Sequence, residues 1–159
     1  MYKKILIPLD GSQLAEAAIH HVKALIEPET EVALLRVALY PTYDYVFSSP
    51  AVAATLSEEI EDESEKYLRE IQARLQAEGL KTSIAVTGGP VADAILDYAD
   101  AIGADLIAMS THGRSGVARW LIGSVADRVV RGSPVPVLLV RPTAVSETES
   151  STAEASHAA

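Results

Sequence analysis

Short apolar runs alternate along the chain with stretches in which apolar residues recur every three or four positions. Uninterrupted runs are typical of strands buried on both faces of a parallel sheet, and the wider spacing is typical of amphipathic helices. The runs predict five strands, at residues 5–9, 32–39, 82–86, 106–109 and 135–140. Helices are predicted around the apolar positions within 14–25, 60–75, 91–102 and 117–129, and the second of these ends near Gly79.

This regular alternation of strand and helix predicts the fold class. An α/β protein of this kind places helices on both faces of an open parallel sheet, and right-handed crossovers limit the possible strand orders. We expect a five-stranded sheet in the order 3-2-1-4-5, with the third and most polar strand at an edge. Strands one and four are then neighbours where the winding reverses, and ligands of such sheets bind there, beyond the carboxyl ends of the strands. The loops after Leu9 and Met109 are therefore the most informative.

Two segments fall outside this pattern. Residues 41–54 carry Tyr43, Tyr45 and Phe47 without a clear period, which fits either a lid or interface element or a plain surface loop. Residues 143–159 are rich in Ser, Thr, Ala and Glu, and such a segment cannot bury enough apolar surface to offset its ordering entropy. We expect a single domain over residues 1–142, followed by a disordered tail.

The composition narrows the classes of function. The formal net charge of −9 argues against non-specific binding to nucleic acid, since such binding needs a basic surface. The chain has no cysteine, so disulfides, thiolate catalysis and cysteine metal sites are excluded. No apolar run approaches the roughly 18 residues of a membrane span. The start of the chain lacks a signal-peptide pattern, so a cytoplasmic location is expected.

Charged residues are unevenly distributed. Six carboxylates lie between Glu58 and Glu65, where they form either a metal site or, more simply, a solvated helix face. By contrast, four arginines lie between residues 114 and 131, opposed only by Asp127. In an acidic protein, one locally basic segment could hold an anion.

The segment with the clearest chemistry runs from Ser110 to Gly116, as Ser-Thr-His-Gly-Arg-Ser-Gly, and continues to Gly123 and Ser124. It follows the fourth predicted strand and leads into a helix. Glycines let backbone amides approach phosphate oxygens, consecutive amides form an anion-binding nest, and a helix start adds unpaired N–H groups. Neither a Walker lysine motif nor a G-x-G dinucleotide fingerprint is present. Taken alone, the same glycines could merely allow a tight turn and close helix packing.

This segment resembles the ATP-binding signature of the universal stress protein family, G-x2-G-x9-G-[S/T]. Gly113 matches the second glycine and Gly123-Ser124 match the closing pair, whereas Ser110 stands where the family has its first glycine. The resemblance covers about residues 1–142 and implies a fold like that of the adenine nucleotide α-hydrolases. Further segments that carry it are residues 4–12, 103–107 and 133–140.

The resemblance also implies a role for individual positions. Asp10 would lie on the ribose and metal side, and the backbone of Val37 would face the adenine edge. Amides of the glycine loop and of the following helix would hold the phosphates, and the small Ser110 would lie near the ribose. The full set of candidate nucleotide-contacting residues is Leu9, Asp10, Val37, Ser110, His112, Gly113, Arg114, Gly116, Gly123, Ser124 and Val125.

Several of these positions have alternative interpretations. Asp10 could instead cap the first helix, with Ser12 as another candidate cap. His112 could act as a base or pack within the loop, and Arg114 could contact phosphate or lie on the surface. Trp120 could stack on a base or belong to the core or an interface.

We therefore expect an ATP-binding regulatory or stress-response module, with Mg²⁺ or Mn²⁺ held mainly by the phosphates. No base, transition-state arginine or Walker lysine can be identified, so hydrolysis is expected to be slow or absent. Alternatives are a slow ATPase, a nucleotide-free dimeric interaction module, and a binder of AMP or cyclic AMP. The apolar edge strand at residues 135–140 predicts a homodimer, and an unidentified protein partner could respond to the bound nucleotide.

Overall fold

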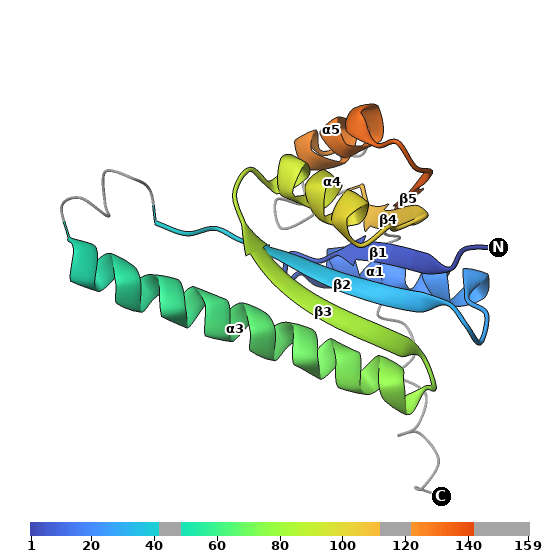
Figure 1. Cartoon of the computed structure of the whole chain (residues 1–159), viewed down its shortest axis with the longest axis horizontal. Coiled ribbons are helices and arrows are strands. Elements are labelled where there is room, and N and C mark those ends of the chain that lie inside the picture. The colour runs from blue at the N-terminus through green and yellow to red at the C-terminus, as the bar shows by residue number, and fades with distance from the viewer. Residues whose placement is uncertain (42–48, 112–121, 142–159) are drawn as a thin grey trace, which may run out of the picture.

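A computed structural model describes residues 1–41, 49–111 and 122–141 of the chain. They form a parallel sheet flanked by helices (Figure 1). The strands are β1 (Lys4–Pro8), β2 (Glu31–Ala38), β3 (Lys81–Gly88), β4 (Leu106–Ser110) and β5 (Val137–Val140). The helices are α1 (Gln13–Val22), the short 3-10 helix η1 (Lys23–Leu25), α3 (Pro50–Ala77), α4 (Val91–Ala101) and α5 (Ser124–Gly132).

The strand order is β3-β2-β1-β4-β5, and every pairing is parallel. This confirms the predicted five-stranded order and the α/β class. Alternate residues of a strand point to opposite faces, so the apolar run of β1 supplies two cores. Ile5 and Ile7 pack with α1 and α3 on one face, and Leu6 packs with α4 and α5 on the other. Figure 1 shows the long α3 on one side of the sheet and α4 with α5 on the opposite side.

Two helices begin at different residues from those expected. Helix α3 starts at Pro50, well before the apolar stripe that begins at Ile60, and proline at the first helical position is well tolerated. Helix α5 starts at Ser124, because Gly123 has a non-helical backbone with φ −58° and ψ 150°. The earlier part of the predicted helix at 117–129, and residues 42–48, lie outside the described residues.

Two strands differ in length from the prediction by two residues or more. Strand β5 begins at Val137 and not at residue 135, after Pro134 and Pro136, which lack backbone donors. Strand β3 lies at an edge as expected, although its eight residues make it longer than the predicted 82–86. Neither change alters the topology, so the carboxyl ends of β1 and β4 remain neighbours at the reversal of the winding.

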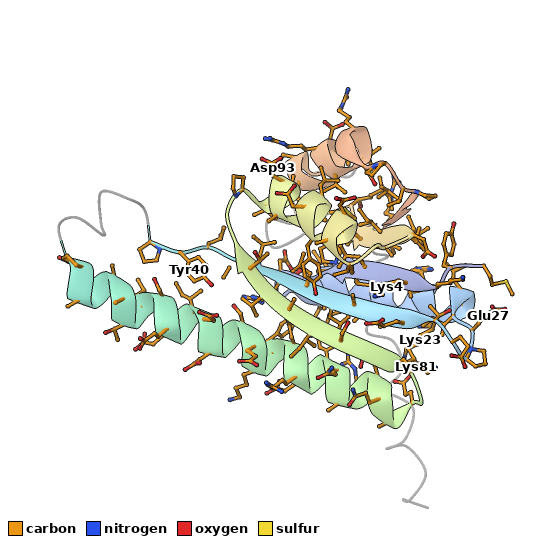
Figure 2. All side chains as sticks on the ribbon, in the orientation of Figure 1. Lys4, Lys23, Glu27, Tyr40, Lys81 and Asp93 are labelled. Carbon is orange, nitrogen blue, oxygen red and sulfur yellow. The ribbon has the colours of Figure 1, made fainter. Side chains whose placement is uncertain are left out.

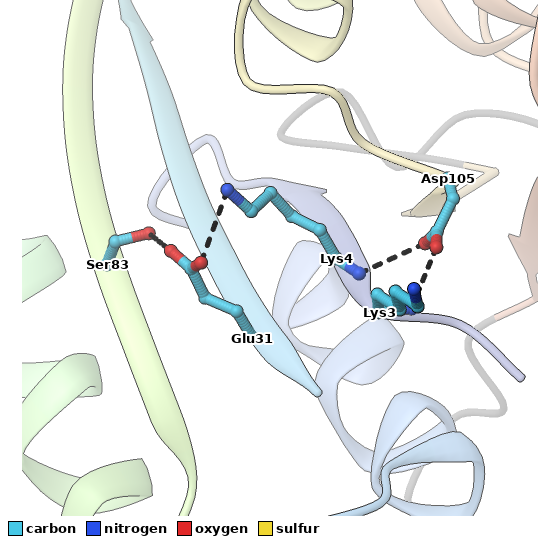
Figure 3. Close-up of polar contacts among 5 residues, drawn as sticks. All are labelled: Lys3, Lys4, Glu31, Ser83 and Asp105. Atoms are coloured by element: carbon cyan, nitrogen blue, oxygen red, sulfur yellow. Dashed lines mark hydrogen bonds and ion pairs between the residues drawn. The ribbon is translucent and has the colours of Figure 1, made fainter. Parts of the chain in front are cut away.

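Polar contacts join the amino ends of four strands, β1 to β4 (Figure 3). The Asp105 carboxylate accepts hydrogen bonds from the backbone amides of Lys3 (2.8 Å) and Lys4 (3.1 Å). On the neighbouring strand, Glu31 accepts from the Ser83 hydroxyl at 2.8 Å and lies 3.3 Å from Lys4 Nζ. These contacts tie β4 to β1, β1 to β2, and β2 to β3 at the edge of the sheet opposite to the carboxyl ends.

The outer face of α3 is strongly charged, and its side chains project away from the sheet (Figure 2). Glu58, Glu59, Glu61 and Asp62 are exposed, whereas Glu63, which is also exposed, lines a cavity. Across residues 1–41, 49–111 and 122–141, no three His, Asp or Glu side chains come together in a group that could hold a metal ion. None of the helices within these same ranges combines the length and apolarity needed to cross a membrane.

Candidate functional site

A cavity of about 470 Å³ opens at the carboxyl ends of β1, β2 and β4, against the start of α5 and one side of α3. Its wall contains every described member of the predicted nucleotide-contacting set. These residues are Leu9, Asp10, Val37, Ser110, Gly123, Ser124 and Val125. The other four predicted members, His112, Gly113, Arg114 and Gly116, lie outside the described residues.

The start of α5 is held against the end of β4 by Gly123. Its backbone amide donates to the Thr111 carbonyl at 2.9 Å, and a Cβ at this position would lie only 2.9 Å from the same oxygen. Real Cβ atoms do not approach a backbone oxygen so closely, so glycine is required here by close packing. Gly123 therefore has a structural role, whatever it contributes to a ligand.

The first amides of α5 are open toward the cavity. Gly123 is the N-cap and has no side chain that could accept from them. Within the described chain, no hydrogen bond engages the N–H groups of Ser124 and Val125, whereas the Asp127 N–H already donates to the Gly123 carbonyl. A helix start with unpaired donors and a positive dipole end is suited to an anion.

Asp10 organises the turn between β1 and α1. One of its carboxylate oxygens accepts from the Ser12 amide (2.9 Å) and the Ser12 hydroxyl (2.6 Å). The Ser12 hydroxyl oxygen in turn accepts from the Ala15 amide at 3.1 Å. Ser12 is therefore the N-cap of α1, and the alternative in which Asp10 caps this helix directly is wrong. Asp10 stays partly exposed on the cavity wall, next to the end of β1.

Val37 presents backbone groups to the cavity because β1 ends before β2 does. The Leu9 amide donates to the Leu35 carbonyl at 2.8 Å. Val37 lies two residues further along β2, so its backbone points the same way. No hydrogen bond of the described chain reaches the Val37 backbone from the β1 side. The Val37 N–H and C=O are thus not engaged by β1, and the cavity wall also includes the apolar residues Leu39, Ile60, Val91, Ile95 and Met109.

Sequence analysis did not single out Arg36 or the wall formed by α3. Arg36 Cζ lies 5.1 Å from the centre of the Tyr67 ring, in a cation–π contact. Arg36 also packs on Gly11, whose φ is +86°, and a Cβ on Gly11 would collide with the guanidinium. A signal was present in the sequence, because Arg36 is the single charged residue in the apolar run at 32–39.

Tyr67 links the cavity wall to α1. Its hydroxyl donates to Glu16 Oε1 at 3.2 Å, and the other Glu16 oxygen lies 2.9 Å from Arg74. Burial, reinforced by the Glu16 carboxylate, raises the pKa of the Tyr67 phenol far above its ordinary value. Tyr67 is therefore a neutral donor at physiological pH, and its ring contacts Arg36.

Comparisons relate the chain to known proteins. The family model described as the universal stress protein family matches residues 1–141. Universal stress protein MJ0531 of Methanocaldococcus jannaschii is 34% identical over 144 residues, which cover 89% of this chain and 83% of that protein. The solved structure of the hypothetical protein MJ0577 of the same organism superimposes with a TM-score of 0.80 at 33% identity, covering 90% of this chain and 98% of the other.

A further solved structure is that of a universal stress protein in complex with cAMP. It has a TM-score of 0.61 at 23% identity and covers 89% of this chain and 98% of its own. At this identity the likeness shows the fold alone.

Proposed function

Because the chain belongs to the universal stress protein family, we propose that it is a nucleotide-dependent regulatory module whose cavity takes up ATP. One observation carries this proposal: all described residues of the predicted site line a single cavity at the reversal of the sheet. Ligands of open α/β sheets bind at this position. The cavity volume of about 470 Å³ also falls in the range of small-molecule sites.

The start of α5 would hold the phosphates. The amides of Ser124 and Val125 can donate to phosphate oxygens, so no charged side chain has to lose its hydration to bind them. The helix dipole also favours negative charge at this end. The Ser124 hydroxyl is exposed and can donate as well. In this proposal Gly113 and Gly116 add amides from the preceding loop, as the sequence pattern predicts.

The nucleoside would extend from there across β1 to β2. Asp10 and Ser110 lie between the two ends of the cavity and offer acceptors to ribose hydroxyls. The Val37 N–H and C=O would pair with the edge of the base, and apolar side chains such as Ile60 and Met109 would cover its faces. A slot of this kind excludes water from the base while leaving its polar edge satisfied.

A divalent metal ion would be held mainly by the phosphates. Asp10 is a carboxylate near the proposed ribose side, but the described residues contain no group of three or more metal-ligating side chains. This donor set fits Mg²⁺ or Mn²⁺, which bind readily through one carboxylate and substrate phosphates. AMP and cyclic AMP remain candidate ligands, and a protein of the same fold has been solved with cAMP.

We also propose a homodimer through β5, which lies at the end of the described sheet. The Pro136 carbonyl accepts from Ile107 of β4, and the Val140 carbonyl accepts from Thr111, which follows β4. Even-numbered residues of β5 therefore face β4, and odd-numbered residues point their backbone outward. Leu138 and Val140 pack in the core, so the free surface of this strand is its backbone. An unpaired edge of this kind favours pairing with a second copy.

The experiment that tests nucleotide binding is a pair of substitutions at Ser124. Ser124→Pro removes one cavity-facing amide while keeping the helix, because proline suits the first helical position and Gly123 already has a backbone compatible with a following proline. Ser124→Ala removes only the hydroxyl and is the matched control. ATP with Mg²⁺ at about 100 times the Kd should stabilise the wild-type protein by roughly 2.7 kcal/mol.

We expect ATP to raise the wild-type Tm, the alanine variant to keep most of this shift, and the proline variant to lose most of it. The Tm without ligand should be similar in all three, since each variant retains the fold. If titration calorimetry and thermal shift detect no nucleotide with the wild-type protein, the proposed function is wrong. If both variants bind like the wild type, the phosphates lie elsewhere.

A further inference from the structure

Arg36 is the only cation among the described residues that line the cavity. Its guanidinium packs on the Tyr67 ring, with Cζ 5.1 Å from the ring centre, and on the backbone of Gly11. Across residues 1–41, 49–111 and 122–141, no carboxylate forms an ion pair with it. A guanidinium that is positioned by packing and not by a carboxylate retains its hydrogen-bond donors for a ligand.

A buried hydroxyl lies on the same part of the cavity wall. Ser64 is only 2% exposed, and it lines the cavity three residues before Tyr67, on the same face of α3. Hydroxyls within helices commonly bond back to the carbonyl four residues earlier, as those of Thr55 (3.2 Å) and Ser57 (2.8 Å) do in α3. The Ser64 hydroxyl takes part in no hydrogen bond of the described chain. Because a buried hydroxyl without a partner is costly, this one is available to a ligand in the cavity.

Arg36 and Ser64 lie away from the start of α5. Alternate residues of β2 point to opposite faces of the sheet, and Leu34 packs with α1 and α3 whereas Leu35 packs with α4 and α5. The side chain of Arg36 therefore points toward α3. Neighbouring strands are about 4.8 Å apart, so the end of β2 is roughly 10 Å from the end of β4, where Gly123 holds the start of α5. Two separate groups of anion donors thus line one cavity.

In the proposed pose, the ribose lies between these two groups. A ribose carries its base and its 5′-carbon on one face of the ring and its 2′- and 3′-hydroxyls on the other. With the base at Val37 and the 5′-phosphates at the α5 amides, the hydroxyls turn toward Asp10. The Arg36 guanidinium packs on Gly11, the residue that follows Asp10. A phosphate carried by one of these hydroxyls would therefore meet Arg36 and Ser64.

We infer that Arg36 and Ser64 form a second phosphate subsite, and that the cavity prefers adenine nucleotides with a further phosphate on the 2′ or 3′ oxygen of the ribose. A guanidinium donates to phosphate oxygens in pairs, and an arginine near the ribose accommodates the 2′-phosphate of NADP in dinucleotide-binding sites. The inference rests on the proposed function, because it assumes a nucleotide in this cavity.

Two carboxylates on the cavity wall limit which phosphate can bind. Glu63 is exposed, so solvent and salt screen its charge. Asp10 lies at the ribose and repels a phosphate on the hydroxyl that it engages. Only the isomer with its phosphate on the other hydroxyl then fits, and the two isomers have to be compared.

Titration calorimetry with AMP, adenosine 2′,5′-bisphosphate and adenosine 3′,5′-bisphosphate tests this subsite, with ATP as the reference ligand. AMP and the two bisphosphates share the base, the ribose and the 5′-phosphate, so they differ only in the added phosphate. The variants are Arg36→Met, which removes the charge and the donors, Arg36→Lys, which keeps the charge but loses the planar fork, and Ser64→Ala, which removes only the hydroxyl. Unliganded Tm values and circular dichroism establish that each variant is folded.

We expect one of the two bisphosphates to bind wild-type protein at least about tenfold more tightly than AMP, the low end of what a hydrogen bond to a charged group contributes. This ratio of affinities should fall close to one in Arg36→Met and decrease about threefold or more in Ser64→Ala. Arg36→Lys should retain part of the preference, since the charge remains. If Arg36→Met keeps the full preference, the added phosphate binds elsewhere and the inference is wrong.

The remaining outcomes separate this inference from the proposed function. If wild-type protein binds ATP and AMP but prefers neither bisphosphate to AMP, only the inference fails. If wild-type protein binds none of the four nucleotides, the proposed function itself fails, and the inference falls with it.

Discussion

Substitution of Gly11 by alanine should destabilise the protein for two separable reasons. Gly11 has φ +86°, a conformation that costs an L-residue about 1–2 kcal/mol. In addition, the new Cβ would collide with the guanidinium of Arg36 and displace it from the Tyr67 ring. Loss of that cation–π contact costs a further ~0.5–1 kcal/mol at a partly exposed site. The expected total is about 1.5–3 kcal/mol.

Gly79 provides the matched control. It has nearly the same backbone angle, φ +88°, but nothing lies within 4 Å of the position of its absent Cβ. Gly79→Ala should therefore cost only the backbone component of about 1–2 kcal/mol. Chemical denaturation measures both values, and thermal scans should show a drop of roughly 2–4 °C for each kcal/mol in a chain of this size.

A double-mutant cycle isolates the contact with Arg36. In an Arg36→Ala background the guanidinium is gone, so Gly11→Ala should cost no more than Gly79→Ala. If Gly11→Ala and Gly79→Ala are equally destabilising in the wild-type background, Arg36 does not pack on Gly11 and its proposed position in the cavity is incorrect.

Four further predictions address other parts of the molecule. ATP turnover should stay well below ~1 s⁻¹, the low end of typical enzymes, and sustained turnover that Ser124→Pro abolishes would contradict this. Val137→Pro removes an outward-facing N–H from β5 and should convert a dimer to a monomer in light scattering, whereas a wild-type monomer at tens of micromolar would refute the dimer. The Ser83 hydroxyl, together with Lys4, holds the pKa of Glu31 below its ordinary value of 4.5. Ionised Glu31 therefore stabilises the fold above pH 4.5, and this stability is lost as the pH falls through the lowered pKa. Ser83→Ala should make the Tm depend less on pH in this acidic range. Removal of residues 146–159 should leave the Tm unchanged, and a loss above about 1 kcal/mol would show that the tail docks.

The sheet was predictable because most of its strands are short apolar runs that alternate with helical stripes. Ile5, Leu6 and Ile7 are buried on both faces of the sheet, and such a run has no solvent-facing side that a helix would need. Strand order then followed from connection rules and from the polar third strand. The strands and their order depend on which positions are apolar and which are polar, and this pattern can be read directly from the sequence.

Helix starts and the α3 wall of the cavity were harder to predict. The first turns of α3 bury only Ala53, so they carry almost no apolar period, and Gly123 interrupts a stripe that looks continuous in sequence. Arg36 was missed because its partners Gly11 and Tyr67 are far from it along the chain. Such a contact exists only after folding, and periodicity cannot reveal it.

The exposed backbone groups at the cavity have a consequence for how this protein tolerates mutation. Every amino acid except proline carries an N–H like those of Ser124, Val125 and Val37, and every amino acid carries a C=O like that of Val37. If these groups hold the nucleotide as proposed, the side chains at these positions can change during evolution without loss of binding. An alanine scan would not detect these backbone groups, because alanine retains them. Substitution by proline or replacement of an amide by an ester would test their contribution to binding.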